Sequence, residues 1–178
     1  MAEIDGDWAT PDTTTLQFAG WTTDADHYIK VYTTAQARHS GKWDTGKYRL
    51  VGAGTFAAIR VSSGTYIKIF GLQIEYAGAS STGGGLSSSG ASAEIGYNIA
   101  RATGSNDQRG IATVFGGNNQ IYNNIVYGFK AGTASEGIRV SGSGGSNWAY
   151  NNTVYDCDIG IIFGVVKNNI SYGNTTNY

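Results

Sequence analysis

The chain has 178 residues, a net charge of −1 and 14% charged residues, which excludes the basic surface typical of proteins that bind nucleic acid or anionic membranes. Its 40% hydrophobic content suits one domain with a sizeable core and excludes a disordered chain. The single cysteine excludes an intrachain disulfide framework and a cysteine metal cluster. We expect no membrane span, because no apolar run approaches the ~20 residues required, and no secretory signal at the N-terminus.

Short alternating segments fill the chain from its N-terminal end, and no convincing amphipathic helix interrupts them. Residues 16–18, 28–34 and 66–77 alternate apolar and polar side chains and are predicted strands. Residues 1–57 show no clean repeat, and we interpret them as an N-terminal cap with irregular first coils. Glycine and serine tracts such as residues 78–90 recur at regular intervals, so we interpret them as loops of a repeating unit.

From residue 58 onward, a small residue followed by an aliphatic one recurs at intervals of 27, 25, 27 and 23 residues. A second turn marker follows within each unit, and each unit divides into three short strands. In the last unit these are residues 160–164, 165–167 and 169–173. A period in this range without helices indicates a solenoid whose coils must stack to bury their inner faces. The sequence therefore predicts an all-β parallel β-helix with about five clear coils over residues 58–178, as one continuous domain with the cap. The pairs that begin the units are Ala58-Ile59, Gly85-Leu86, Gly110-Ile111, Gly137-Ile138 and Gly160-Ile161, and the second markers are Gly71, Gly96, Asn123, Asn151 and Asn168.

Alternation within the strands predicts which side chains face the core. The turn asparagines Asn123, Asn151 and Asn168 are expected to line one turn of successive coils and to hydrogen-bond from coil to coil. The predicted inward positions are Ile59, Val61, Leu86, Ile111, Thr113, Ile138, Val140, Ile161 and Phe163 in first strands, Ile67, Ile69, Ile121 and Val166 in second strands, and Leu72, Ile74, Ile99, Val126 and Val154 in third strands.

The Gly-Ile marker followed by Asn-Asn-x-Val/Ser-Tyr resembles the right-handed parallel β-helix repeat of the pectate-lyase-like superfamily, best over residues 58–178. Residues 27–50 resemble the N-terminal part of β-helix proteins from bacteria and phages. The resemblance implies a right-handed β-helix, polysaccharide as the ligand, and an extracellular or virion-associated location. The superfamily holds polysaccharide lyases, glycoside hydrolases, tailspikes and adhesins, so the fold alone does not select an activity.

Lyases of this superfamily use acidic residues to hold Ca²⁺ and an arginine or lysine as the base. Arg109 falls one coil before Glu136 in the repeat, an arrangement that an ordinary surface ion pair explains equally well. No intact catalytic set is visible and we predict no metal site, so Ca²⁺ enters only as what the resemblance implies. The hydrolases need close aspartates plus a histidine, but His27 and His39 lie outside the clear coils. The catalytic candidates are Asp107, Arg109, Glu136, Asp156 and Asp158.

Outward aromatic residues are the candidates for substrate binding. Tyr127, Tyr155 and Tyr172 occupy equivalent positions in three coils, and Trp148 projects from a second strand. Such a tyrosine ladder either stacks on sugar rings or stacks on itself to stabilise neighbouring strands. The loops at residues 78–84, 102–108 and 130–135 leave the same edge of consecutive coils and are expected to wall a groove.

Two functions from different classes are consistent with this pattern. The first is binding or processing of a polysaccharide along a lateral face, with lyase or hydrolase chemistry if the protein is an enzyme. The second is a structural or assembly module without catalysis. An uncapped last coil with Ile161, Phe163 and Val166 would expose apolar side chains. We therefore expect either that the chain is a fragment of a longer β-helix or that a second copy of the chain covers this coil.

Overall fold

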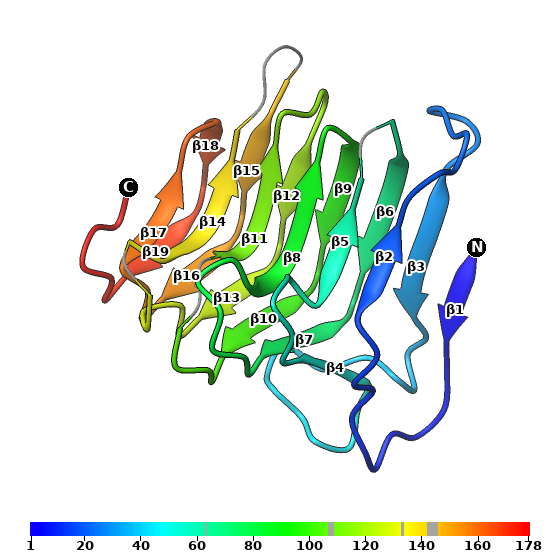
Figure 1. Ribbon diagram of the computed structural model, residues 1–178, viewed down its shortest axis with the longest axis horizontal. Helices are drawn as coiled ribbons and strands as arrows, with labels where there is room; N and C mark the ends of the chain where they lie inside the picture. Colours follow the sequence, from blue (N-terminus) through cyan, green and yellow to red (C-terminus); the bar gives the residue numbers. More distant parts are fainter. Residues whose placement is uncertain (63, 107–108, 133, 142–145) are drawn as a thin grey trace.

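The computed structural model describes residues 1–62, 64–106, 109–132, 134–141 and 146–178. All regular structure in these residues is β-strand (Figure 1). No helix in this part of the chain is long and apolar enough to cross a membrane. The N- and C-termini lie at opposite ends of a stack of coils (Figure 1).

Every strand pairs in parallel with a strand one coil away, which produces three sheets of six, seven and six strands. This arrangement confirms the predicted all-β parallel β-helix, with about six turns where the sequence showed five clear coils. The additional turn comes from strands within residues 1–57, which pair in the same three sheets. The first sheet contains β2 (Leu16–Phe18), β5 (Ile59–Val61), β8 (Gly84–Ser89), β11 (Arg109–Val114), β14 (Glu136–Val140) and β17 (Ile159–Ile162). The second sheet contains β1 (Ala2–Ile4), β3 (Ile29–Thr33), β6 (Tyr66–Phe70), β9 (Ser92–Gly96), β12 (Gln120–Tyr122), β15 (Trp148–Tyr150) and β18 (Val165–Lys167). The third sheet contains β4 (Arg49–Gly52), β7 (Gln73–Tyr76), β10 (Ile99–Ala102), β13 (Ile125–Tyr127), β16 (Thr153–Tyr155) and β19 (Ile170–Tyr172).

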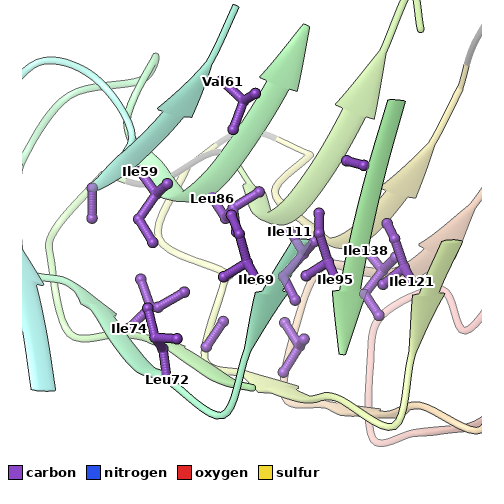
Figure 2. Close-up of a cluster of buried hydrophobic side chains, with 14 of the residues drawn as sticks. Ile59, Val61, Ile69, Leu72, Ile74, Leu86, Ile95, Ile111, Ile121 and Ile138 are labelled. Atoms are coloured by element: carbon purple, nitrogen blue, oxygen red, sulfur yellow. The ribbon is translucent and has the colours of Figure 1, made fainter. Parts of the chain in front are cut away.

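Rows of aliphatic side chains, one per coil, fill the space between the three sheets (Figure 2). Each row forms because parallel pairing in register places equivalent residues directly above one another. Burial of each valine, leucine or isoleucine in these rows stabilises the fold by about 1.5–3 kcal/mol. The first-sheet row is Ile59, Leu86, Ile111, Ile138 and Ile161; the second-sheet row is Ile69, Ile95, Ile121 and Ala149; the third-sheet row is Leu50, Ile74, Ala100, Val126 and Val154.

The small residue that precedes each first-strand aliphatic residue has a steric cause. A Cβ atom on Gly110 would lie 2.4 Å from the Val126 Cγ1 atom and 2.6 Å from the Gly137 carbonyl oxygen. A Cβ atom on Gly137 would lie 2.4 Å from Val154 Cγ1. Because some of the atoms that such a Cβ would meet belong to the backbone, they cannot move aside by a side-chain rotation. The small residue before each first-strand aliphatic residue is therefore required by the close approach of the first and third sheets.

The Asn-Asn pairs divide two tasks at the turn between the second and third strands. The first asparagine has a left-handed backbone, with φ of 53° at Asn123, 56° at Asn151 and 51° at Asn168. This conformation is tolerated best by glycine and asparagine. The coil-to-coil ladder is built by the second asparagine of each pair, which corrects the prediction that placed the ladder at the first.

The ladder runs through three buried amides and a fourth, Asn169, that is partly buried. Asn98 Nδ2 donates to Asn124 Oδ1 (3.1 Å), Asn124 Nδ2 to Asn152 Oδ1 (3.0 Å), and Asn152 Nδ2 to Asn169 Oδ1 (3.0 Å). Each Nδ2 also donates to a second-strand carbonyl of the preceding coil, such as Ile95 O for Asn124 (3.0 Å). Each Oδ1 accepts a backbone N–H as well, as Asn124 does from Asn98 N (3.0 Å). The ladder therefore satisfies backbone groups that the turn would otherwise leave buried without partners.

Two predicted inward positions are wrong. Ile99 pairs with Gln73 and Ile125, and its neighbour Ala100 occupies the inward row, so Ile99 faces outward. It is nevertheless fully buried. Phe163 has a left-handed backbone (φ 63°) at the end of β17, which turns its ring outward and leaves it 55% exposed. Val166 keeps its predicted row, opposite Ala149, but is 42% exposed because β18 is the last strand of its sheet.

Residues 34–48 leave the coil between β3 and β4 and contact the outer face of the third sheet. Gln73 accepts from Asp44 N (2.6 Å) and donates to Tyr48 O (3.0 Å). The guanidinium of Arg101 lies 3.7 Å from the ring centre of Trp43. This excursion belongs to the segment expected to cap the solenoid.

Asn124→Ala is expected to lower the free energy of unfolding by about 3 kcal/mol, because it leaves several buried backbone and amide groups without partners. Asn123→Gly is the matched control, and it is expected to change stability by less than about 0.5 kcal/mol because glycine accepts the left-handed backbone. Urea unfolding followed by circular dichroism measures both. Equal losses in the two variants would contradict the division of tasks.

A second stability prediction concerns an inward row that contains two hydroxyl groups, Val61–Ser88–Thr113–Val140. The Oγ atoms of Ser88 and Thr113 are buried without a hydrogen-bond partner among the described residues. Thr113→Val is expected to raise the free energy of unfolding by about 1 kcal/mol, since it removes an unsatisfied hydroxyl at similar volume. Thr153→Val, on the outward side of β16, should change it by less than about half as much. A loss of stability at Thr113 would mean that an ordered water satisfies the hydroxyl.

Candidate functional site

The outer face of the first sheet carries a row with two cationic side chains, each beside an aromatic ring. One outward row runs Gln17–Arg60–Ser87–Ala112–Arg139–Ile162, one residue per coil. Alternation requires this orientation, because the strand neighbours Ile59, Val61, Ile138 and Val140 are buried in the core. The loops at residues 78–84, 102–106 and 130–132 lead into this sheet from the third sheet.

Each of the two arginines in this row is paired with an exposed phenylalanine. Arg60 lies 4.3 Å from the ring centre of Phe56, and Arg139 lies 4.9 Å from that of Phe163. Both rings are more than half exposed, at 53% and 55%. Only the short side chains of Ser87 and Ala112 stand between the two arginines in the row. Three strand spacings separate the arginines, which corresponds to roughly 14 Å along the axis.

Arg60 also borders two hollows on this face. One, of ≈ 330 Å³, lies between the segment at residues 54–57 and strand β2. The other, of ≈ 250 Å³, is lined by Ser62, Ser87 and Ser89. The arginine therefore stands between two recesses, one bounded by Phe56 and one bounded by hydroxyl groups.

The catalytic candidates Arg109 and Glu136 meet on the same sheet. Arg109 Nε lies 2.8 Å from Glu136 Oε2, and Arg139 Nη1 lies 2.5 Å from Glu136 Oε1. The Glu136 side chain is only 7% exposed, and each of its oxygens accepts from a guanidinium. This geometry orients the two arginines, and both carboxylate oxygens already accept from guanidinium groups.

The remaining acidic candidates do not form a cluster. Asp156 pairs with Lys130 (2.6 Å) at an exposed turn, and Asp158 Oδ2 accepts from Ser135 N (3.1 Å). Asp107 lies outside the described residues. In the part of the chain that is described, no group of three or more His, Cys, Asp or Glu side chains gathers as a metal site.

Tyr127, Tyr155 and Tyr172 stack as a ladder on the outer face of the third sheet. Their ring centres are 4.9 Å and 5.6 Å apart, with interplanar angles of 7° and 18°. Tyr122 and Tyr150 stack in the same way on the second sheet, at 5.1 Å and 10°. Rings stacked face to face cover each other's faces, which are the surfaces a sugar ring would need. The geometry favours strand stabilisation over sugar stacking within these ladders.

Trp148 lies on the outer face of the second sheet, away from the tyrosine ladder of the third. The ammonium group of Lys167 lies 5.1 Å from its ring centre, in a cation–π contact. The structure therefore does not gather the four predicted binding residues on one surface.

Sequence reasoning missed Arg60, Phe56, Arg139 and Phe163 as a group. The outward row could have been found, because Arg60 and Arg139 each directly follow an inward aliphatic residue of the repeat. Phe163 could not, since strand alternation predicts it inward and only the left-handed backbone turns it outward.

Comparisons with protein-family models, curated proteins and solved structures found no match to this chain. The fold assignment to a parallel β-helix therefore rests on the strand pairing, and the pectate-lyase-like resemblance stays a prediction.

The two histidines lie far from the first sheet's outer face. His27 is exposed beside Asp24 (3.0 Å). His39 is partly buried, with Nε2 2.9 Å from Tyr97 O and Nδ1 accepting from Gly41 N (3.1 Å). Both ring nitrogens are thus satisfied by the neutral imidazole, with Nε2 as the donor. Burial lowers the pKa of His39, partly offset by its hydrogen bond to Tyr97, and the charge of Arg38 lowers it further.

His39 is expected to make folding pH-dependent. Its pKa in the folded state lies below the ordinary value of 6.5, so the unfolded chain binds the proton more readily. The stabilisation by neutral His39 is complete above pH 6.5 and is lost as the pH falls through the folded pKa. Urea unfolding between pH 7.5 and pH 5 should show a smaller loss of stability in His39→Gln than in the unaltered chain. Parallel losses would contradict the assignment.

Proposed function

We propose that this β-helix binds an acidic polysaccharide along the outer face of its first sheet. The observation that carries the proposal is the pair of phenylalanine-backed arginines, Arg60 and Arg139, at the two ends of one axial row. A polymer extended along the solenoid axis would meet both.

The chemistry of this face suits an acidic sugar chain. Guanidinium groups recognise carboxylates through paired N–H donors, and a ring behind the guanidinium limits its motion. The exposed rings of Phe56 and Phe163 offer apolar surface beside each cation. Arg60 and Arg139 are the cationic side chains of this row among the described residues, in a chain of net charge −1.

Binding without cleavage is the form of this proposal that the geometry supports. Lyase or hydrolase chemistry requires a free base or a pair of carboxylates at the sugar, and both oxygens of Glu136 are held by arginines. Arg109 and Arg139 act in this proposal as binding groups that the buried carboxylate positions.

A structural module is the second candidate function. The self-stacked tyrosines favour it, because the third sheet's outer face then stabilises coils and leaves no ring face for a sugar. In this case we expect the exposed Val165, Val166 and Ile170 of the last strands to contact a second copy of the chain.

Binding assays with polygalacturonate, alginate and neutral dextran test the first proposal. We expect the acidic polymers to bind, more weakly as salt is raised, and dextran not to bind. Arg60→Gln is expected to weaken binding about tenfold, since it removes a charged hydrogen-bond donor. Lys42→Gln, which removes the same charge from an exposed loop, is the matched control and should bind as the unaltered chain does.

Release of unsaturated or reducing ends should be measured in the same samples. Cleavage of any of these polymers by the unaltered chain would contradict the proposal of binding without catalysis. Absence of binding to every polymer would overturn the proposal and favour the structural module.

A further inference from the structure

A separate hollow of ≈ 230 Å³ lies on the outer face of the second sheet, away from the arginine row. Its walls come from strands β3, β6 and β12 and from the turns that follow β3 and β9. Aromatic and cationic side chains line it: Tyr32, Phe70, Tyr97, Tyr122, Lys30 and Arg38. Among the described residues no carboxylate belongs to this lining, but Glu3 and Glu94 accept hydrogen bonds from the hydroxyls of Tyr32 and Tyr122 at its edge.

The hollow lies beside a coil that has no outward side chain in this row. The outward row of the second sheet runs Tyr32–Phe70–Gly96–Tyr122, so glycine interrupts a row of rings. A Cβ atom at Gly96 would lie 2.8 Å from the Tyr122 ring and 3.3 Å from the Phe70 ring. These rings instead converge across the gap, with centres 6.4 Å apart and planes inclined by 51°. Tyr122 stacks on Tyr150 through one face, and its other face is inclined toward Phe70, so part of that second face stays open.

Tyr97 adds a ring to this hollow against local backbone preference. It has a left-handed backbone (φ 59°), at the turn where the other coils place Gly71, Asn123, Asn151 and Asn168. Glycine or asparagine would avoid the strain of a tyrosine there. The ring is 49% exposed and meets Tyr122 edge to face, at 5.6 Å and 86°. The fold does not require a tyrosine at this turn position, so the backbone strain at Tyr97 indicates that its side chain has another role.

Two cations face the hollow without an ion pair. Arg38 is held by Thr33, through Nε to Oγ1 (3.2 Å) and Nη2 to the carbonyl oxygen (2.7 Å), and three of its five N–H groups remain available. Lys30 Nζ lies 4.5 Å from the ring centre of Tyr32. Within the described residues neither cation forms a salt bridge, whereas the nearby Lys68 pairs with Glu94 at 3.1 Å.

We propose that this hollow binds a small molecule or terminal group that consists of one ring and one carboxylate. The rings of Phe70, Tyr97 and Tyr122 would pack against the ligand ring, and Lys30 and Arg38 would bind its carboxylate. The volume is below the range of about 300–1,000 Å³ that accommodates drug-sized ligands, which limits the occupant to about one ring. This site is on a different sheet from the proposed polysaccharide face, and neither requires the other.

Calorimetric titration with four probes tests the recognition chemistry. Glucuronate and benzoate carry a ring and a carboxylate, glucose carries only the ring, and acetate carries only the charge. At least one of the first two should bind about tenfold more tightly than both glucose and acetate. Preference for glucuronate identifies a sugar acid, and preference for benzoate identifies an aromatic acid. Equal affinity for all four probes, or binding of none, would overturn the proposal.

Variants locate the binding. Lys30→Gln should weaken the preferred probe about tenfold, while Lys42→Gln leaves it unchanged. Tyr97→Asn should also weaken it, with a midpoint of thermal unfolding that is unchanged or raised by about 2–4 °C, because asparagine relieves the backbone strain. If the probe binds the Lys30 and Tyr97 variants as tightly as the unaltered chain, the site is not this hollow. Loss in Arg60→Gln alone would assign the binding to the first sheet.

Discussion

The structure depends on strand pairing that stays in register from coil to coil. No coil can bury its inner side chains alone, so each aliphatic residue leaves water only when the coils above and below place equivalent residues at the same height. The amide ladder of Asn98, Asn124, Asn152 and Asn169 holds this alignment at one turn. A slip by one residue would reverse the inward and outward faces of a strand and would break several amide hydrogen bonds together.

The same register builds the outer surfaces. Where the outward residues of successive coils are alike, as with Tyr127, Tyr155 and Tyr172, the row closes on itself and its ring faces are covered. Where they differ, some side chains in the row have no identical neighbour to stack on. Gly96 removes a side chain from a row of rings, and the short residues Ser87 and Ala112 separate two arginines. The candidate binding surfaces therefore lie where the repeat is interrupted on the outside but preserved in the core.

The fold was predictable from sequence because its cause is periodic. Gly110 and Gly137 mark the close approach of two sheets, and Asn-Asn pairs mark the turn with its ladder, so spacing alone indicated coils. The misassigned residues have local causes that spacing does not report. Alternation failed at Phe163 because the backbone turns left-handed there. It failed at Ile99 because burial beneath an outer cover and burial in the core look alike in sequence.

The candidate sites were less predictable than the fold. Arg109 and Glu136 were found as a pair because both lie in the repeat, yet the third member, Arg139, comes from the same strand as Glu136 and was not connected to it. Tyr97 follows the predicted turn marker Gly96 by one residue, and only the backbone angle reveals that the tyrosine occupies the left-handed position. Side chains brought in from outside the coils, such as Arg38, leave no periodic signal at all.

The position of the two arginines on the coils determines how the distance between them can change when coils are gained or lost. Arg60 and Arg139 are separated by a whole number of coils, so their distance can vary only in steps of one strand spacing, about 4.8 Å. Duplication or loss of one coil between them would leave the core rows and the asparagine ladder intact while it lengthened or shortened the span by one step. The number of coils between Arg60 and Arg139 therefore sets the distance between the two positive charges.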